Sequence, residues 1–319
     1  MSASTVAQNL AAAQQLPINR LDAQLLMLHV LGRTAHERAW LLAHDNDPLD
    51  ASLHAVFVGL AARRAAGEPL AYLTGFRAFY GLQVAVSPDV LIPRPDTETL
   101  VDWALALLAL ATPEVPPNAA KPETPRVLDL GTGSGAIALA LKHQLPNAQV
   151  TATDFSLPAL AMAQANAARL GLDIHFLHSN WLAGLQASQI SHISPGSPVD
   201  PLGQNRQTAH LQAHNSQPQP FDLIVSNPPY IVEGDAHLPA LQHEPPCALT
   251  SGADGLDDIR QIIAQAPAHL RPGGWLLLEH GFDQAGAVRA LLAQAGYTQV
   301  QSRCDLNRME RCSGGQRCP

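Results

Sequence analysis

The chain has 319 residues, of which 46% are hydrophobic, and a formal net charge of −8. This length and composition predict a globular protein with a large buried core, in one or two domains, and exclude an intrinsically disordered chain. The acidic balance, with Lys121 and Lys142 as the only lysines, argues against a dedicated phosphate-binding face and hence against nucleic acid as a partner.

The sequence has no feature typical of a membrane protein, a secreted protein or a metal-binding protein. No apolar run reaches the ~18 residues of a membrane span, and the first residues lack the basic start and apolar block of a signal peptide. The four cysteines form no C-x-x-C pair and the 14 histidines lack metal-ligand spacing, so we expect no metal site. We therefore expect a cytoplasmic protein, a monomer by default, with a protein or small-molecule substrate.

The first 74 residues are predicted to form a small helical bundle. Leucines at helical spacing predict a helix that ends at Gly32, and Thr34 with Glu37 has the pattern of a capping box for a second helix. A third helix is expected at 51–66, before a turn at 68–75. This bundle carries no catalytic cluster, and its residues fit both a packing domain and a docking surface for a partner.

A hairpin and an extended segment are expected to link the bundle to the rest of the chain. Strand-like residues on both sides of Tyr80-Gly81 predict the hairpin. Prolines then keep 87–96 extended, and Asp96 is expected to cap a helix that runs to about Ala111. A Pro/Ala-rich stretch at 112–125 predicts a further linker.

From Arg126 onward, strands and helices alternate, which predicts an α/β fold with a parallel sheet and helices on both faces. A stretch at 183–220, rich in Ser, Gln, His, Pro and Gly, interrupts this order and predicts a flexible surface insertion. The expected strands are 127–130, 150–153, 174–177, 223–225 and, after a turn at 272–274, 275–279, with one or two more in the tail; the expected helices are 136–144, 157–170, 255–270 and 283–294.

A glycine-rich turn follows the first of these strands. Asp129 precedes Gly131-x-Gly-x-Gly135, whose glycines let the backbone approach a ligand closely. Asp154 ends the next strand, where its carboxylate can accept both hydroxyls of a ribose. Dinucleotide-binding enzymes have a similar turn, but their later glycine is absent here. The combination favours a nucleoside-containing cofactor, with a nicotinamide cofactor as the alternative.

A second candidate site lies where the strand at 223–225 ends. Pro228 and Pro229 cannot donate to a sheet ladder and hold the chain in a rigid shelf after Asn227. The Asn227 oxygen and the Pro228 carbonyl can each accept one hydrogen from a planar NH2 group, while the Tyr230 ring can cover its flat face. The shelf therefore predicts a site for a planar nitrogen, at the sheet edge where ligands bind.

Separated blocks of this sequence resemble the HemK/PrmC family of glutamine methyltransferases, which modify peptide chain release factors. The resemblance implies a seven-stranded Rossmann-like methyltransferase sheet with helices on both faces, preceded by a small all-α bundle and a β-hairpin linker. It also implies domains at 1–74, 75–95 and 96–319, the last with the 183–220 insertion. The blocks are 68–75, Leu91-Ile-Pro-Arg-Pro-Asp-Thr-Glu98, 127–140, Ser226-Asn-Pro-Pro-Tyr-Ile231, 254–256 and 272–281.

The same resemblance implies a role for each matching residue. S-adenosyl-L-methionine would be the cofactor, and class 1 release factors would be the substrates, modified on the glutamine of their Gly-Gly-Gln motif. The helical residues 1–74 would contact the release factor. Catalytic roles would fall to Asn227, Pro228 and Tyr230, substrate binding to Asn227, Pro228, Pro229 and Tyr230, and cofactor binding to Gly131, Thr132, Gly133, Ser134, Gly135, Asp154, Trp181 and Asn227.

The chain departs from the family pattern at two places. Asn180 stands where the family usually has an aspartate before the tryptophan, so the adenine contact loses a charge, and the 183–220 insertion is long.

Two alternative functions come from other classes of protein. A DNA adenine methyltransferase would use the same shelf but needs a basic groove for a flipped base, and a non-catalytic scaffold would bind the cofactor without methyl transfer.

Overall fold

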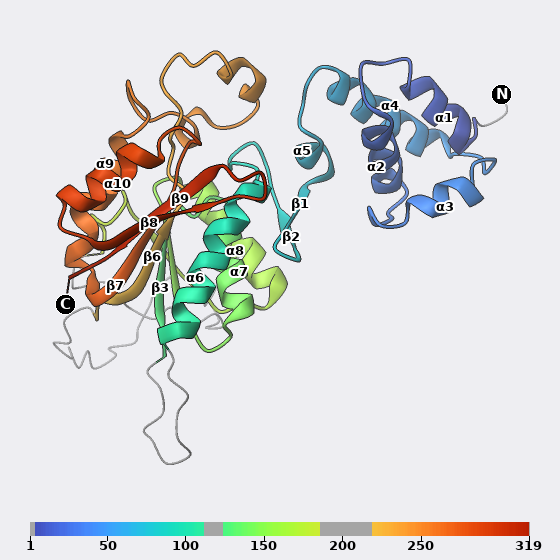
Figure 1. The fold of residues 1–319 in the computed structure, drawn as a ribbon. Helices are drawn as coiled ribbons and strands as arrows, with labels where there is room; N and C mark the ends of the chain where they lie inside the picture. Colours follow the sequence, from blue (N-terminus) through green and yellow to red (C-terminus); the bar gives the residue numbers. More distant parts are fainter. Residues whose placement is uncertain (1–3, 112–123, 186–218, 319) are drawn as a thin grey trace, which may run out of the picture.

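The computed structural model describes residues 4–111, 124–185 and 219–318. Figure 1 shows a helical N-terminal part and a larger part built around a sheet, with a small hairpin between them. Most of the expected linker at 112–125 and of the expected insertion at 183–220 lies outside the described residues.

The N-terminal part is a bundle of helices around its own apolar core. Its central side chains, among them Leu26, Met27 and Phe57, are at most 1% exposed. Short polar side chains begin three of the helices, because their oxygens accept backbone N–H groups that the first turn leaves unpaired. The helices are α1 (Val6–Ala13), α2 (Arg20–Val30), α3 (Arg38–Ala43), α4 (Ala51–Ala65) and α5 (Leu70–Thr74).

The bundle differs from the sequence-based expectation in two respects. The Thr34 hydroxyl caps no helix, because the Glu37 carboxylate accepts its hydrogen at 3.1 Å and the helix α3 begins only at Arg38. The segment expected as a turn at 68–75 contains α5, which ends at Gly75 in the left-handed conformation that favours glycine.

The expected hairpin is confirmed. Strands β1 (Phe76–Phe79) and β2 (Leu82–Ala85) pair antiparallel across Tyr80 and Gly81, whose φ angles of +48° and +77° suit a two-residue hairpin turn. The bundle is tied to the following segment by the Tyr72 hydroxyl, which donates a buried hydrogen bond of 2.7 Å to the Val90 carbonyl.

The helix expected after Asp96 is present, but Asp96 does not cap it. A single 3-10 turn, η1 (Pro95–Thr97), leads directly into α6 (Glu98–Ala111). The Asp96 carboxylate instead forms an ion pair with Arg311, 3.3 Å away. This pair joins two segments far apart in the sequence, which a capping pattern does not reveal.

A seven-stranded sheet confirms the expected α/β fold. Its order is β5-β4-β3-β6-β7-β9-β8, with parallel pairs from β5 to β7 and antiparallel pairs at β7–β9 and β9–β8. The strands are β3 (Arg126–Leu130), β4 (Gln149–Asp154), β5 (His175–His178), β6 (Phe221–Ser226), β7 (Leu270–Glu279), β8 (Thr298–Cys304) and β9 (Glu310–Gln316).

Helices cover both faces of this sheet, as Figure 1 shows. On β6, Leu223 and Val225 pack into one core with α6 and α7, whereas Ile224 packs into the other core with α9 and α10. This alternation follows from the two-residue period of a strand. The helices of the sheet part are α6, α7 (Ala136–Gln144), α8 (Leu157–Leu170), α9 (Asp257–Gln265) and α10 (Ala285–Gln294), with 3-10 turns η2 (Leu238–Leu241), η3 (Pro246–Ala248) and η4 (Ala266–Ala268).

Most of the expected boundaries hold, and α7 and α8 have the expected ends. The strand expected at 275–279 begins earlier, at Leu270, because the chain pairs with β6 on both sides of an irregularity that takes up Pro272-Gly-Gly. The helix expected at 255–270 is shorter and ends in η4. Within the described ranges, no helix is both long and apolar enough to span a membrane.

Candidate active site

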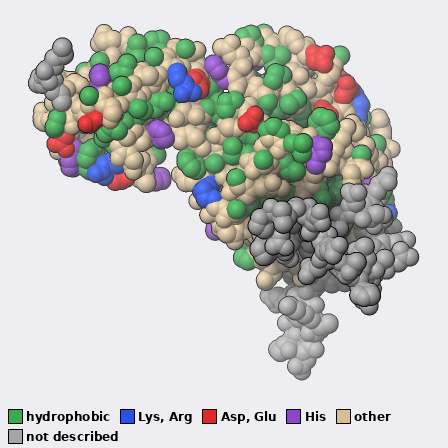
Figure 2. Space-filling model, turned by 180° about the vertical axis from the view of Figure 1, so that it is seen from behind, with side chains coloured by type: hydrophobic (Ala, Val, Ile, Leu, Met, Phe, Trp, Pro, Cys, Tyr) green, Lys and Arg blue, Asp and Glu red, His purple; other side chains and the backbone are tan. Residues whose placement is uncertain are grey.

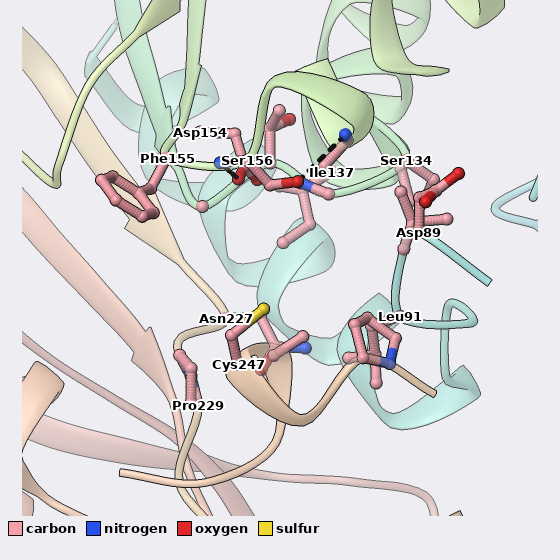
Figure 3. Close-up of a pocket in the computed structure, with 18 of the residues that line it drawn as sticks. Asp89, Leu91, Ser134, Ile137, Asp154, Phe155, Ser156, Asn227, Pro229 and Cys247 are labelled. Carbon is pink, nitrogen blue, oxygen red and sulfur yellow. Dashed lines mark hydrogen bonds between the residues drawn. The ribbon is translucent and has the colours of Figure 1, made fainter. Parts of the chain in front are cut away.

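A cavity of about 370 Å³ lies at the carboxyl ends of β3, β4 and β6. These strands are neighbours in the sheet, and the chain order reverses direction between β3 and β6, which is where open α/β sheets bind ligands. Figure 3 shows Asp154, Phe155 and Ser156 on one side of the cavity and Asn227, Pro229 and Cys247 on the other. Predicted site residues that line the cavity are Gly131, Thr132, Gly133, Ser134, Asp154, Trp181, Asn227 and Pro229.

The glycine turn is held by a buried acid. Asp129 is 0% exposed, and its Oδ2 atom accepts hydrogen bonds from the Thr132 hydroxyl at 2.7 Å and from the Ala138 N–H at 3.1 Å. These bonds join the turn to the first residues of α7. Burial raises the pKa of the Asp129 carboxyl to about 7, because a charge without water is costly. Asp129 therefore shapes the turn from behind the cavity.

Asp154 faces the cavity from the end of β4. Its Oδ2 atom accepts the Gly133 N–H and its Oδ1 atom accepts the Ser156 N–H, both at 2.8 Å. Burial raises the pKa of the Asp154 carboxyl, while these backbone hydrogen bonds act in the opposite direction. Each oxygen keeps a lone pair, so the carboxylate can accept two hydroxyl groups without moving.

Two aromatic side chains, Trp181 and Phe155, line the cavity. The Trp181 indole donates from Nε1 to Asp258 Oδ1 at 3.0 Å, and its backbone has a φ of +47°. A Cβ atom at Gly131 would lie 3.1 Å from Cζ3 of this ring, so the absence of a side chain lets the indole lie against the turn. Phe155 also lines the cavity and is 71% exposed. A flat apolar ring would fit beside these two side chains.

The shelf begins directly after β6. Asn227 donates from Nδ2 to the Thr97 hydroxyl at 3.3 Å, whereas its Oδ1 atom is buried and has no hydrogen-bond partner. Pro229 lines the cavity beside it. Because an unpaired buried acceptor is costly, the Asn227 oxygen marks a position where a donor from a ligand would be stabilised.

Three predicted site residues, Gly135, Pro228 and Tyr230, lie outside the cavity lining. Gly135 precedes α7 with a φ of +87°, and the Pro228 side chain within the shelf is buried. The Tyr230 ring packs against the core on the α9 side, and its hydroxyl donates to Glu279 Oε1 at 3.4 Å. Roles for these three residues stay predictions.

Hydrogen bonds with neighbouring segments fix the backbone of the shelf. The Gln284 side chain donates from Nε2 to the Tyr230 carbonyl at 2.9 Å, and the Ile231 N–H donates to the Leu249 carbonyl at 2.9 Å. Gly255 has a φ of +73°, and a Cβ atom there would lie 2.2 Å from the Tyr230 oxygen. The shelf therefore holds its position only because residue 255 has no side chain.

Comparison with known proteins identifies the family. Residues 4–75 match the family model of the PrmC N-terminal domain, and residues 101–210 match that of the methyltransferase small domain. A release factor glutamine methyltransferase from Bordetella pertussis is 48% identical over 98% of this chain and 99% of its own length. The chain belongs to the release factor glutamine methyltransferase family.

Other members of this family are similar over the same extent. The Burkholderia pseudomallei release factor glutamine methyltransferase is 44% identical, over 99% of this chain and 97% of its own length. The one from Xylella fastidiosa strain Temecula1 is 46% identical, over 97% of each chain. The resemblance stated from sequence motifs is thereby confirmed, and S-adenosylmethionine is the cofactor of this methyltransferase.

The cavity fits this cofactor in three respects. The Asp154 carboxylate suits the two hydroxyls of a ribose, and the Trp181 and Phe155 side chains suit an adenine ring. A Cβ atom at Gly133 would meet nothing within 4 Å, so the turn leaves open space beside its backbone for a ligand. Among the described residues, no group of three or more His, Cys, Asp or Glu side chains could hold a metal ion.

Sequence reasoning missed three residues that hold the site. Thr97 and Glu279 lie inside the quoted motif blocks but had no role, and Asp258, the partner of Trp181, had no signal at all. A signal for Glu279 did exist, since it is a single charged residue at the end of the apolar strand Trp275–Glu279 and is only 1% exposed. Buried charges of that kind are rare without a function or a partner.

Proposed function

We propose that the protein transfers a methyl group from S-adenosylmethionine to the side-chain amide nitrogen of a glutamine, and that this glutamine belongs to the Gly-Gly-Gln motif of class 1 peptide chain release factors. The single observation that carries the proposal is the buried, unpaired Oδ1 atom of Asn227, a residue that lines the same cavity as Asp154 and the glycine turn. A primary amide offers the donor that this oxygen lacks.

Each residue predicted to bind the cofactor has a role in this proposal. Gly131, Thr132, Gly133 and Ser134 surround the methionine part, Asp154 accepts the ribose hydroxyls, and Trp181 lies beside the adenine. Gly135 supports the turn at the start of α7. Asn180 lines the cavity at the position where the family usually has an aspartate. The adenine is therefore held with one negative charge fewer.

The shelf supplies positioning and charge stabilisation. When bound, S-adenosylmethionine supplies an electrophilic methyl group on a sulfonium. The Asn227 Oδ1 atom and the Pro228 carbonyl each accept one hydrogen of the glutamine NH2 group, so the nitrogen presents its remaining electron density in one direction. These acceptors also stabilise the positive charge that develops on the nitrogen. Holding both partners in one geometry can lower the barrier by several kcal/mol.

The remaining shelf residues form the walls and the support. Pro229 bounds the slot for the glutamine side chain, and Tyr230 fixes the shelf from the α9 side. We assign no general base, because a protonated N-methyl amide is strongly acidic and releases its proton to the Asn227 side or to water. Apolar residues at the mouth, including Leu91, Pro93 and Ala248, keep the slot dry.

We further propose a division of labour among three segments. Residues 1–74 form a helical docking domain for the release factor, residues 75–95 a linker, and residues 96–319 the methyltransferase domain. Exposed apolar side chains on the bundle, such as Leu42 at 70% and Val56 at 52%, offer contact area for a protein. The protein acts as a monomer in this proposal.

Mass spectrometry of a release factor tests the proposed function. We expect incubation with enzyme and S-adenosylmethionine to add a single methyl group, located by fragmentation on the glutamine of the Gly-Gly-Gln motif. A release factor with asparagine at that position is the matched substrate control and should gain no methyl group. Methylation at another residue, or of double-stranded DNA instead of the release factor, would reject the proposal.

A further inference from the structure

The orientation of the Asn227 amide decides what the shelf can bind. An asparagine side chain has an acceptor end and a donor end, and only the acceptor end can hold the NH2 group of the proposed substrate. The acceptor, Oδ1, has no partner in the protein, whereas the donor, Nδ2, is 3.3 Å from the Thr97 hydroxyl. The contact with Thr97 therefore selects the orientation that leaves the acceptor free.

The Thr97 hydroxyl can accept from Asn227 only if its own hydrogen goes elsewhere. The acceptor available to that hydrogen is the buried Glu279 carboxylate, whose pKa the nearby Thr97 hydroxyl lowers and whose Oε2 atom has no hydrogen-bond partner. A carboxylate has only acceptors, and hydrogen bonds to a charged group are stronger than those between neutral groups. Thr97 is 3% exposed and Glu279 is 1% exposed, so water does not compete for either side chain.

Glu279 also reaches the other end of the shelf. The Tyr230 hydroxyl donates to its Oε1 atom at 3.4 Å, and its Oε2 atom has no partner. One carboxylate at the end of β7 thus contacts the tyrosine of the shelf directly and the asparagine of the shelf through one hydroxyl.

We propose that Thr97 and Glu279 are positioning residues, and that the hydrogen-bond chain from Asn227 through Thr97 to Glu279 holds the Asn227 oxygen toward the substrate nitrogen. The proposal rests on the proposed function, because it assumes a substrate with an NH2 group. If the hydrogen bonds ran in the opposite direction, Thr97 would donate to Asn227. The Asn227 NH2 group would then face the substrate NH2 group, and two donors cannot bind each other.

The hydrogen-bond chain runs from Asn227 to Glu279, and so leaves the Asn227 oxygen free, only while Glu279 is ionised. Charged and titratable groups face Glu279 from each neighbouring segment: Tyr230 from the shelf, Asp96 from η1, and Arg311 and Cys312 from β9. Burial and Asp96 raise the pKa of the Glu279 carboxyl, Arg311 and the Thr97 and Tyr230 hydroxyls lower it, and the result is about 7. Protonated Glu279 could donate to Thr97, and turnover should therefore increase as the pH rises through about 7.

A matched pair of variants at Thr97 tests this hydrogen-bond chain. Thr97→Val keeps the shape but removes the hydroxyl, and we expect kcat for glutamine methylation to fall at least about 10-fold, because misplaced reacting groups lower the rate steeply. Thr97→Ser restores the hydroxyl and should recover kcat to within about threefold of wild type. The affinity for S-adenosylmethionine, measured by calorimetry, should stay within about twofold in both variants.

Glu279→Gln provides the second test. We expect kcat to fall and its rise near pH 7 to disappear, since glutamine does not titrate and can donate to Thr97. Equal kcat in Thr97→Val and Thr97→Ser, or an unchanged pH profile in Glu279→Gln, would overturn the proposal. A parallel loss of cofactor affinity and melting temperature in all three variants would show a merely structural role and would also overturn it.

A measurement without substrate separates this proposal from the proposed function. In a ¹H–¹⁵N spectrum, the Asn227 NH2 signals should shift with pH through the titration of Glu279 and lose that shift in Thr97→Val. If wild-type enzyme fails to methylate a release factor but these signals behave as expected, the proposed function fails and the orientation stands. If the signals ignore both pH and Thr97, the orientation is wrong whatever the substrate.

Discussion

Arg94 and Glu244, 150 residues apart in the sequence, form an ion pair that joins the two walls of the cavity mouth. Arg94 lies in the extended segment that contributes Leu91 and Pro93, while Glu244 directly precedes the loop that contributes Pro245 and Cys247. The Glu244 side chain is 3% exposed and also accepts the Ile92 N–H at 3.2 Å. One buried carboxylate therefore joins two segments that line the cavity.

Glu244→Ala should separate the walls and weaken substrate binding. The change leaves the Ile92 N–H buried without an acceptor, which costs about 1–3 kcal/mol of stability and lowers the melting temperature. We expect KM for the release factor to rise more than kcat falls. Glu233→Ala, at an exposed glutamate in the same loop, is the control, and equal KM values in the two variants would contradict this prediction.

Asn227→Ala should nearly abolish turnover while the cofactor still binds. The change removes the acceptor for the substrate nitrogen, and loss of one such charge-stabilising group typically costs about 100-fold or more in kcat. Methyl transfer to a release factor measures kcat, and calorimetry measures cofactor affinity. Asn307→Ala, at an exposed turn position, should leave both unchanged. Normal methylation by Asn227→Ala would refute the assigned role.

Asp154→Ala should weaken the affinity for S-adenosylmethionine. It removes the acceptor for the ribose and also the partner of the Gly133 N–H, so the turn loses a support. Hydrogen bonds to a charged group contribute about 1.5–3 kcal/mol, which predicts a loss of affinity of at least about 10-fold by calorimetry. Asp173→Ala, at an exposed residue before β5, is the control. Unchanged affinity in Asp154→Ala would remove Asp154 from the site.

Gly131→Ala and Gly32→Ala form a pair that separates backbone strain from steric contact. Both glycines have a φ of +67°, so alanine should cost each about 1–2 kcal/mol of stability. A Cβ atom at Gly32 meets nothing within 4 Å, whereas one at Gly131 lies 3.1 Å from the Trp181 ring. We therefore expect similar melting temperatures, with a loss of cofactor affinity in Gly131→Ala alone. Equal cofactor affinities in the two variants would show that the Trp181 ring can move away from an alanine at position 131 without weakening cofactor binding.

Asp129→Asn should flatten the dependence of stability on pH. The folded protein holds the Asp129 proton up to a pH of about 7, whereas the unfolded chain releases it near the ordinary aspartate pKa of 3.8. The contribution of this group to stability is therefore complete below the unfolded pKa and is lost as the pH rises toward 7. Melting temperatures measured across this range should decline less in Asp129→Asn than in wild type. Identical slopes would mean that Asp129 titrates normally.

Local sequence signals predicted the parts of the site that depend on neighbouring residues. The glycine turn, Asp154 and the Asn227 shelf each follow an apolar strand, and the carboxyl ends of parallel strands meet at one edge. The helix α1 was not predicted separately, although Thr5 and Gln8 form a complete capping box there. That signal was present in the sequence and could have been used.

Contacts between distant segments could not be predicted in this way. Thr97 is 130 residues from Asn227, and Asp258 is 77 residues from Trp181. The Asp96 side chain fits a helix cap by local rules, but the folded chain brings Arg311 within reach and the ion pair forms instead. Local propensity decides such a residue only where no tertiary partner competes for it.

The close approach of Gly255 to the Tyr230 carbonyl extends the functional site to a residue that touches no ligand. Every side chain there would have to displace the shelf, since its first carbon would lie 2.2 Å from that oxygen. A library of random variants selected for methylation should consequently lose nearly all substitutions at codon 255, as it does at codon 227, while variants at the neighbouring exposed Ala253 survive.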